Sequence, residues 1–314
     1  MTALFTIILP VFLVVGFGYV VAWRGWFREG SVDGLMMFAQ NFAVPMLLFT
    51  SMARLDLSTG FRAALLVPFY AGAFASYAIG WSAAKFAFRR PPMDCVAIGF
   101  VCLFSNSLLL GVPITERAYG TDALLGNWAI IALHSPLLYT FGITMMEFTR
   151  ARGTGLSVGR VAMRALSGVA RTPLVIGILC GLAVNLMMAQ GLILPEGFWA
   201  AVDMIARAAL PAALFGLGGV LHRYRPEGDA GPIIICCACA LILHPAITLG
   251  LGRVMGLDSA GMRSAVMTAA MAPGVNAYLF ANIYGAARRV AASAVLVATA
   301  LSVLSVWMWL AVLP

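Results

Sequence analysis

The chain has 314 residues, of which 62% are hydrophobic and only 10% are charged, and its mean hydropathy is +0.96. Soluble domains carry about a quarter of charged residues, so this composition excludes an ordinary soluble protein and predicts a polytopic membrane protein in contact with the lipid bilayer. The net charge of +8 does not indicate nucleic-acid binding, because the basic residues are spread over short connections rather than gathered on one face.

Apolar runs recur along the whole chain, and each is long enough to cross the roughly 30 Å hydrocarbon layer as a helix. They predict an all-α membrane protein with ten transmembrane helices, at about 4–22, 35–52, 64–82, 95–115, 127–148, 172–190, 198–220, 232–250, 264–284 and 291–312. The first run has no basic residue before it and no small-residue cleavage site after it, so we interpret it as a retained span rather than a signal peptide.

The placement of arginine and lysine predicts the orientation of these spans. Connections after the first, third, fifth, seventh and ninth spans hold fourteen of these residues, against five in the other connections. By the positive-inside rule, we expect both termini to lie outside. The connection 149–171 is then cytoplasmic, and its Arg160 and Arg164 share a helical face. That face either lies on the anionic inner leaflet or belongs to a solvated tether.

The two halves of the chain resemble each other at nearly constant offsets of 163 to 166 residues. The matched pairs are Pro10 with Pro173, Gly18 with Gly181, Pro45 with Pro211, Phe49 with Phe215, Pro68 with Pro232, and Tyr119 with Tyr284. We therefore predict a five-helix repeat at 1–148, a cytoplasmic linker at 149–171 and a second five-helix repeat at 172–314. An odd number of spans inverts the second repeat in the membrane, an architecture typical of secondary transporters.

The fourth and ninth predicted spans both carry residues that interrupt a helix. Gly111 and Pro113 predict a break in the fourth span, and Pro273 with Gly274 predicts one in the ninth. Either break alone could be a kink in a packing helix. Together, at matching positions of inverted repeats, they predict half-helix N-termini that bind a carboxylate. The expected substrate-binding residues are Ser105, Asn106, Ser107, Pro273, Gly274, Asn276 and Tyr278.

Arg207 is expected near the centre of the seventh span, where an unpaired arginine costs at least about 2.5–3.5 kcal/mol. It either pairs with Asp203, one turn earlier, or faces an aqueous path and meets an anionic substrate. His134 and His244 are intramembrane as well, and each is either a structural histidine or the carrier of a coupling proton. No Asp or Glu lies beside the breaks, so a coupling proton is favoured over sodium, and neither a cofactor nor a metal site is expected.

Several blocks of the chain resemble the auxin efflux carrier family, which includes plant PIN-type auxin exporters and bacterial carriers for malonate and similar carboxylates. They are "ILPVFLVVGFGYVVAWRGWF", "NFAVPMLLFTSM", "NSLLLGVPITERAYG", "RTPLVIGILCGL", "LHPAI" and "NAYLFANIYG". The resemblance implies a scaffold of the first, second, sixth and seventh helices, a transport domain in which the fourth and ninth helices cross, elevator-type movement and a homodimer. It also implies that Asn106 is the asparagine at the crossing. Plant carriers have proline where this chain has Ser105, which argues against auxin-like specificity.

Together with the resemblance, these features favour a secondary transporter of small organic anions, mono- or dicarboxylates such as malonate. We expect it in the cytoplasmic (inner) membrane of a bacterium, with both termini in the periplasm. An exporter of auxin-like aromatic carboxylates is the alternative within the same class. An intramembrane sensor or enzyme is the alternative from a different class. A sensor would normally carry a signalling domain, and an enzyme would need a paired acid and base or a metal set near the midplane; the sequence displays neither.

Overall fold

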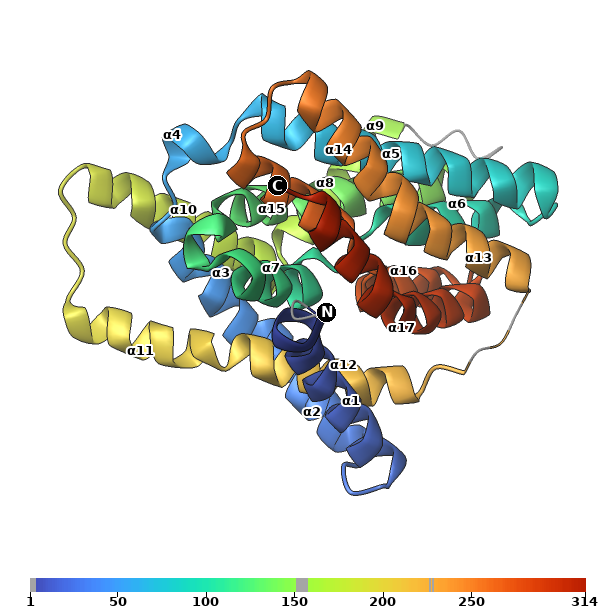
Figure 1. Ribbon diagram of the computed structural model, residues 1–314, viewed down its shortest axis with the longest axis horizontal. Coiled ribbons are helices and arrows are strands. Elements are labelled where there is room, and N and C mark those ends of the chain that lie inside the picture. Colours follow the sequence, from blue (N-terminus) through green and yellow to red (C-terminus); the bar gives the residue numbers. More distant parts are fainter. Residues whose placement is uncertain (1–3, 151–157, 226, 228) are drawn as a thin grey trace.

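The structure is a computed structural model that describes residues 4–150, 158–225, 227 and 229–314 (Figure 1). Within these residues the chain is helical throughout, and the β interaction present is an isolated antiparallel bridge between Ser105 and Pro273. The α-helices are α1 (Leu9–Trp23), α2 (Glu29–Phe38), α3 (Val44–Ala53), α4 (Leu57–Gly60), α5 (Ala63–Ser82), α6 (Pro92–Leu103), α7 (Val112–Tyr119), α8 (Leu125–Arg150), α9 (Val158–Ala170), α10 (Pro173–Ala189), α11 (Glu196–Arg207), α12 (Ala209–His222), α13 (Ala230–Ala238), α14 (His244–Val254), α15 (Ser259–Ala269), α16 (Val275–Tyr284) and α17 (Arg288–Val312).

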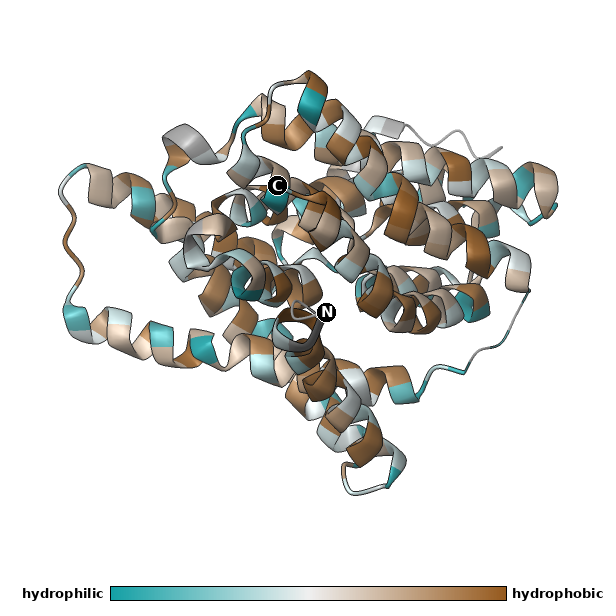
Figure 2. Cartoon of the chain, viewed as in Figure 1, coloured by the Kyte–Doolittle hydropathy of each residue, from teal (hydrophilic) through white to brown (hydrophobic). Residues whose placement is uncertain are grey.

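Seven helical segments of the described chain are long and apolar enough to cross a membrane, which confirms the all-α membrane protein. They are Thr6–Trp23, Glu29–Ala53, Ala63–Ala87, Leu125–Arg150, Glu196–His222, Ala230–Val254 and Arg288–Val312. Large apolar side chains such as Phe17, Leu179, Met204 and Leu304 are exposed. Figure 2 shows long hydrophobic stretches along the helices. A lipid-facing surface accounts for this exposure, which a soluble monomer would avoid.

The other three predicted spans have a different form. The sixth is the shorter apolar helix α10, of 17 residues. The fourth divides into α6 and, after a gap, α7 with the short helical turn before it. The ninth divides into α15 and α16, separated by residues 270–274. The fourth and ninth predicted spans are therefore the interrupted ones.

Wide π-helical turns precede several of the prolines. Four of the five described π turns end two residues before a proline: at Ile8, Ala43, Gly111 and Leu243, before Pro10, Pro45, Pro113 and Pro245; the fifth, Ala83–Ala87, does not. Proline lacks an N–H and clashes with the carbonyl four residues earlier. A turn that is one residue wider gives the ring room, so the chain stays helical through the proline.

This widening corrects the expected position of the break in the fourth span. Gly111 has helical angles (φ −63°, ψ −48°) and its N–H donates to the carbonyl of Asn106, 3.1 Å away, in the i to i+5 pattern of a π turn. Pro113 is the second residue of α7. The structure places the interruption at residues 104–106, before both of these residues. Pro273 and Gly274, in contrast, lie in the interruption of the ninth span, as expected.

Two helix pairs pack backbone to backbone through glycines that the repeat relates to each other. In α1, a Cβ atom added to Gly18 would overlap the carbonyl oxygen of Phe215 in α12. In α10, a Cβ atom added to Gly181 would overlap the carbonyl oxygen of Phe49 in α3. Gly18 matches Gly181 in the sequence repeat, and Phe215 matches Phe49. The same contact thus occurs twice, each time between one helix from either half of the chain.

Candidate functional site

The two interrupted segments lie side by side at the isolated antiparallel bridge between Ser105 and Pro273, a meeting point named here the crossing. The N–H of Asn106 donates to the carbonyl of Ala272 (2.8 Å), and the N–H of Gly274 donates to the carbonyl of Phe104 (2.9 Å). These bonds satisfy backbone groups that would otherwise be unpaired inside the bundle. Pro273 has no N–H to offer a helix, which favours the extended chain at this point. Positions 166 to 170 residues apart in sequence are thereby brought together.

Helices begin again on both sides of the crossing. A π turn (η4, Ser107–Gly111) continues into α7, and α16 starts at Val275. Neither start has a side-chain cap: Asn106 precedes the first and Gly274 the second. The first N–H groups of a helix lack partners within the helix and carry partial positive charge. The crossing thus holds two helix starts that can attract an anion without a full cation.

A small cavity of about 90 Å³, named here the inner cavity, lies against the crossing. Its lining residues are Gln40, Val44, Leu48, Phe104, Ser105, Asn106, Ser107, Leu108, Leu109, Ile131, His134, Ser135, Leu174, Ile178, Gly274, Val275 and Asn276. No Arg, Lys, Asp or Glu is found among these described residues. Five of the expected binding residues are brought together here: Ser105, Asn106, Ser107, Gly274 and Asn276. Pro273 stands in the bridge beside them.

Some polar side chains of the inner cavity already form hydrogen bonds within the protein, and others do not. The hydroxyls of Ser105 and Ser107 are 2.8 Å apart and hydrogen-bond each other. Asn106 is only 7% exposed, and Asn276 is half-buried, yet neither side-chain amide has a hydrogen-bond partner in the described part of the chain. Buried amides are usually bonded, so these two are available to a ligand.

A larger cavity of about 700 Å³, named here the vestibule, adjoins the inner cavity and shares Gln40, Ser135, Leu174 and Asn276 with it. Its other lining residues are Asn41, Tyr139, Ile143, Glu147, Arg160, Gly168, Val169, Thr172 and Pro173. Side chains from the end of α8 and from α9 thus line a cavity that adjoins the inner cavity.

The two histidines have different positions. His134 lines the inner cavity, and its Nε2 lies 3.2 Å from the carbonyl oxygen of Ser105. His244 is outside both cavities, with its Nε2 3.0 Å from the carbonyl oxygen of Phe69. The ring of Phe69 contacts both imidazoles, at centroid distances of 5.8 and 4.8 Å. His134 alone is thus close enough to contact a ligand at the crossing.

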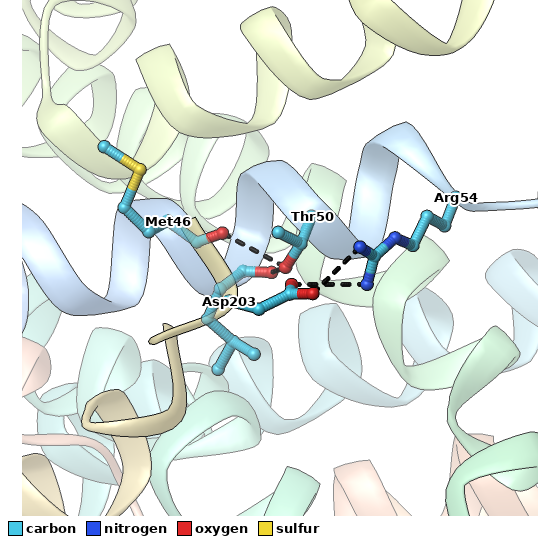
Figure 3. A network of polar contacts seen from close by, with 5 residues as sticks. Met46, Thr50, Arg54 and Asp203 are labelled. Carbon is cyan, nitrogen blue, oxygen red and sulfur yellow. Dashed lines mark hydrogen bonds and ion pairs between the residues drawn. The ribbon is translucent and has the colours of Figure 1, made fainter. Parts of the chain in front are cut away.

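Arg207 and Tyr278 lie away from the crossing. Asp203 does not pair with Arg207; it forms a two-pronged ion pair with Arg54 at the end of α3, with N–O distances of 3.0 and 3.2 Å (Figure 3). Arg207 is exposed at the end of α11 and lines neither cavity. The ring of Tyr278 packs on Tyr224, with centroids 4.6 Å apart, in a separate pocket.

Helix α8 fixes the crossing through side chains that face it. The amide of Asn127 donates to the hydroxyls of Thr268 (2.8 Å) and Thr115 (3.2 Å), which joins α8 to α15 and α7. The hydroxyl of Tyr139 donates to the carbonyl of Asn276 (3.2 Å). A preorganised site needs this kind of second layer of contacts.

Sequence reasoning did not identify Gln40, Ser135 and Tyr139 as site residues. Gln40 lies in a π turn of the second span, and Ser135 follows His134 in α8. Polar side chains inside the apolar runs "AQNFAVP" and "HSPLL" are the signal that marks them. That signal shows that such a residue needs a polar surrounding, but it does not show which segment supplies it.

Interrupted helices beside a cavity within a membrane-spanning bundle are typical of membrane transporters. The chain belongs to the membrane transport protein family, whose sequence profile matches residues 3–310. The match confirms the predicted resemblance to the auxin efflux carriers. The chain is therefore a transporter, and not the intramembrane sensor or enzyme that the sequence left open as an alternative.

Relatives match nearly the whole chain. A protein of Rhizobium meliloti (strain 1021) named "Putative malonate transporter" is 24% identical over 96% of this chain and 92% of its own length. An "Uncharacterized transporter" of Methanothermobacter thermautotrophicus is 24% identical over 98% of this chain and 97% of its own. The "Uncharacterized transporter YfdV" of Escherichia coli (strain K12) is 20% identical over 96% of this chain and 95% of its own.

Proposed function

We propose that this transporter is a secondary carrier of small organic anions, such as malonate and other short mono- or dicarboxylates. The observation that supports this most is the inner cavity: two helix starts and the unpaired amides of Asn106 and Asn276 surround a space without a charged side chain among its described lining residues. The name of the Rhizobium relative points to the same substrate class.

Carboxylate oxygens would accept hydrogen bonds from the two amides and from the first N–H groups after Asn106 and Gly274. Hydrogen bonds to a charged group contribute about 1.5–3 kcal/mol each, and backbone donors do so without a cation that would hold the anion too tightly for release. The narrow inner cavity favours a short acid over an aromatic one.

The vestibule would be the entry on the cytoplasmic side. Its lining includes Arg160 of the linker, with Glu147 before the linker and Thr172 after it, and the arginine count assigns the linker to the cytoplasm. Arg160 is the cationic residue among the described lining residues and would attract an anion towards the crossing. In this proposal the protein lies in a bacterial inner membrane, with both termini in the periplasm, and the structure is the inward-facing state.

Transport would follow an elevator-type mechanism built on the inverted repeat. The repeated contacts of Gly18 with Phe215 and of Gly181 with Phe49 support a rigid scaffold made of α1, α2, α3, α10, α11 and α12. The remaining helices, which contain both interruptions, would move as a transport domain and carry the crossing from one side of the membrane to the other. We expect the scaffold to form the contact of a homodimer.

His134 would carry a coupling proton, because it lines the inner cavity and no described acidic residue does. The variant His134→Gln keeps a polar side chain at this place but cannot titrate. We expect it to bind substrate yet to lose uptake driven by an imposed proton gradient. Gradient-driven uptake at the wild-type rate would contradict the role of His134.

Substrate binding by purified protein tests the proposal directly. Malonate and related short acids should raise the unfolding temperature, and Asn106→Ala should weaken malonate binding about tenfold, the loss expected for one charge-assisted hydrogen bond. Gln190→Ala, which removes an exposed amide at the end of α10, is the matched control. If folded protein binds only aromatic acids, the substrate class is wrong; if it binds no organic anion, the carrier proposal is wrong.

A further inference from the structure

A further polar hollow shares no lining residue with the inner cavity or the vestibule and lies between the end of α12, the connection to α13 and the helices α16 and α17. It has a volume of about 310 Å³. Its lining residues are Arg223, Tyr224, Arg225, Glu227, Tyr278, Asn282, Arg288, Arg289 and Ala292, which we call the arginine pocket. Four arginines from two distant segments thus meet around one hollow, with a single acidic side chain among its described lining residues.

The positive charge of the arginine pocket is only partly neutralised. Arg223 pairs with Asp33 of α2, 2.7 Å away. Arg289 is 80% exposed and lies 3.9 Å from Glu227, a distance at which an exposed pair contributes little. Arg225 and Arg288 form no ion pair or hydrogen bond through their side chains in the described part of the chain. Two guanidinium groups are therefore available to an anion.

The base of the pocket is fixed by contacts between segments. The hydroxyl of Ser293 in α17 accepts a hydrogen bond from the N–H of Glu227 (2.9 Å) and donates to its carbonyl (2.6 Å), which fastens the connection to α17. Tyr224 is only 6% exposed and packs on Tyr278 of α16. Its hydroxyl is buried without a hydrogen-bond partner. Tyr224 lines the arginine pocket together with Arg225 and Arg288, and the two unpaired guanidinium groups are suited to an acceptor-rich anion.

We infer that the arginine pocket binds a phosphate group, and that its source is an anionic phospholipid headgroup. Guanidinium groups bind phosphate oxygens through paired N–H donors. All four arginines belong to connections that the positive-inside rule assigns to the cytoplasm, at the level of the inner-leaflet headgroups. That rule accounts for arginines in these connections, but it does not account for the convergence of four of them on one hollow that Tyr224 also lines.

The pocket also touches the moving parts of the proposed mechanism, although the inference does not depend on that mechanism. Arg223 and Tyr224 follow α12, whereas Tyr278 and Asn282 belong to α16, the half-helix that also carries Asn276 of the inner cavity. A bound headgroup would contact both α12 and α16. The phosphate would therefore stabilise one relative position of these helices.

Native mass spectrometry and thermal unfolding of the full-length protein in detergent test the inference. The probes are phosphatidylglycerol, phosphatidylcholine as the zwitterionic comparison, and inorganic phosphate. We expect phosphatidylglycerol to bind and stabilise more than phosphatidylcholine. The double variant Arg225→Gln/Arg288→Gln should weaken its binding at least about tenfold, the loss of one charge-assisted hydrogen bond or more. Tyr224→Phe, which removes only the hydroxyl, should weaken it less.

Arg28→Gln is the matched control, because Arg28 is exposed, forms no ion pair in the described chain and belongs to a connection on the same predicted side. Inorganic phosphate binding that is lost in the double variant would support the phosphate site and assign it to a soluble ligand instead of a lipid. Equal binding of both lipids with no phosphate binding, or an equal loss in Arg28→Gln, would overturn the inference.

Discussion

Single glycines decide how closely the helices approach each other in the inferred scaffold. Gly18 and Gly181 have no side chain where the backbone carbonyls of Phe215 and Phe49 lie. Membrane helices gain stability from such close packing, because lipid provides little hydrophobic drive for one helix to bind another. Each of these positions therefore leaves no space for even one methyl group.

The variant Gly18→Ala tests this packing. The new methyl group would overlap the carbonyl of Phe215, so we expect a loss of about 1–3 kcal/mol in the free energy of unfolding, the usual effect of overpacking. Gly16→Ala is the control on the same helix, since nothing lies within 4 Å of a Cβ at that position. Equal unfolding temperatures for the two variants, measured in the same detergent, would contradict the backbone contact.

Sequence reasoning was informative for Asn106 and Asn276 but not for Arg207. An amide in an apolar run beside a helix breaker is tolerated only near other polar groups. The sequence alone therefore indicates that such a residue lies in a polar environment. The partner of Asp203 could not be predicted in this way. Arg54 is 149 residues away in sequence, and the ion pair forms only after α3 and α11 have packed together. A search within one helical turn therefore found Arg207, the local candidate, and missed Arg54.

At the scale of elements, the prolines show what a sequence can and cannot locate. Proline was expected to break the helix at Pro113, yet a π turn absorbs Pro113 and the chain stays helical. The gap falls at residues 104–106, where the bridge to Pro273 supplies partners for the freed backbone. The existence of an interruption was predictable from one segment. Its position depended on the second segment, which pairs with it.

Asp258 links the starts of two helices and gives a pH-dependent prediction. Its carboxylate accepts hydrogen bonds from Arg62, which precedes α5 (2.9 Å), and from the N–H of Gly261 in α15 (2.7 Å). The bond from Arg62, followed by that from Gly261, lowers the pKa of the Asp258 carboxyl below its usual value. A lowered pKa means that the stabilisation is complete above the unfolded pKa of about 3.9 and is lost as pH falls through the folded pKa.

The variant Asp258→Asn keeps a capping side chain but removes the charge. Because the pair is half-exposed, we expect only about 0.2–1 kcal/mol less stability at pH 7. The difference from wild type should shrink below about pH 4, where the carboxylate becomes protonated. Unfolding curves between pH 3 and pH 7 would measure it. A difference that is constant over this range would show that the charge of Asp258 does not contribute.

At the scale of the whole molecule, the proposed mechanism divides the helices into a fixed and a moving body. Arg117 of α7 donates to the carbonyl of Thr6 (2.7 Å), a contact between the two bodies that lies outside both cavities. The Arg54–Asp203 pair lies within the fixed body (Figure 3). These two pairs allow movement between the bodies to be distinguished from a general effect of cross-linking.

We expect a flexible thiol cross-link in Thr6→Cys/Arg117→Cys to stop uptake, because it ties the moving body to the fixed one. The same cross-link in Arg54→Cys/Asp203→Cys should leave uptake largely intact. Both variants need Cys180→Ser as background, since Cys180 is the exposed native cysteine. The rate of uptake before and after reduction of a cleavable linker is the measurement. Undiminished uptake by fully cross-linked Thr6/Arg117 protein would contradict an elevator-type movement.

The central claim is that the crossing of the two interrupted helices binds an organic anion that is carried across the membrane. Uptake of labelled malonate into proteoliposomes tests it most directly, with wild type, Asn106→Ala and the control Gln190→Ala compared at equal amounts of folded protein. We predict saturable uptake by wild type and Gln190→Ala, and about tenfold weaker apparent affinity in Asn106→Ala. Saturable uptake that is unchanged in Asn106→Ala, or no saturable uptake of malonate or any other short carboxylate by wild type, would contradict the claim.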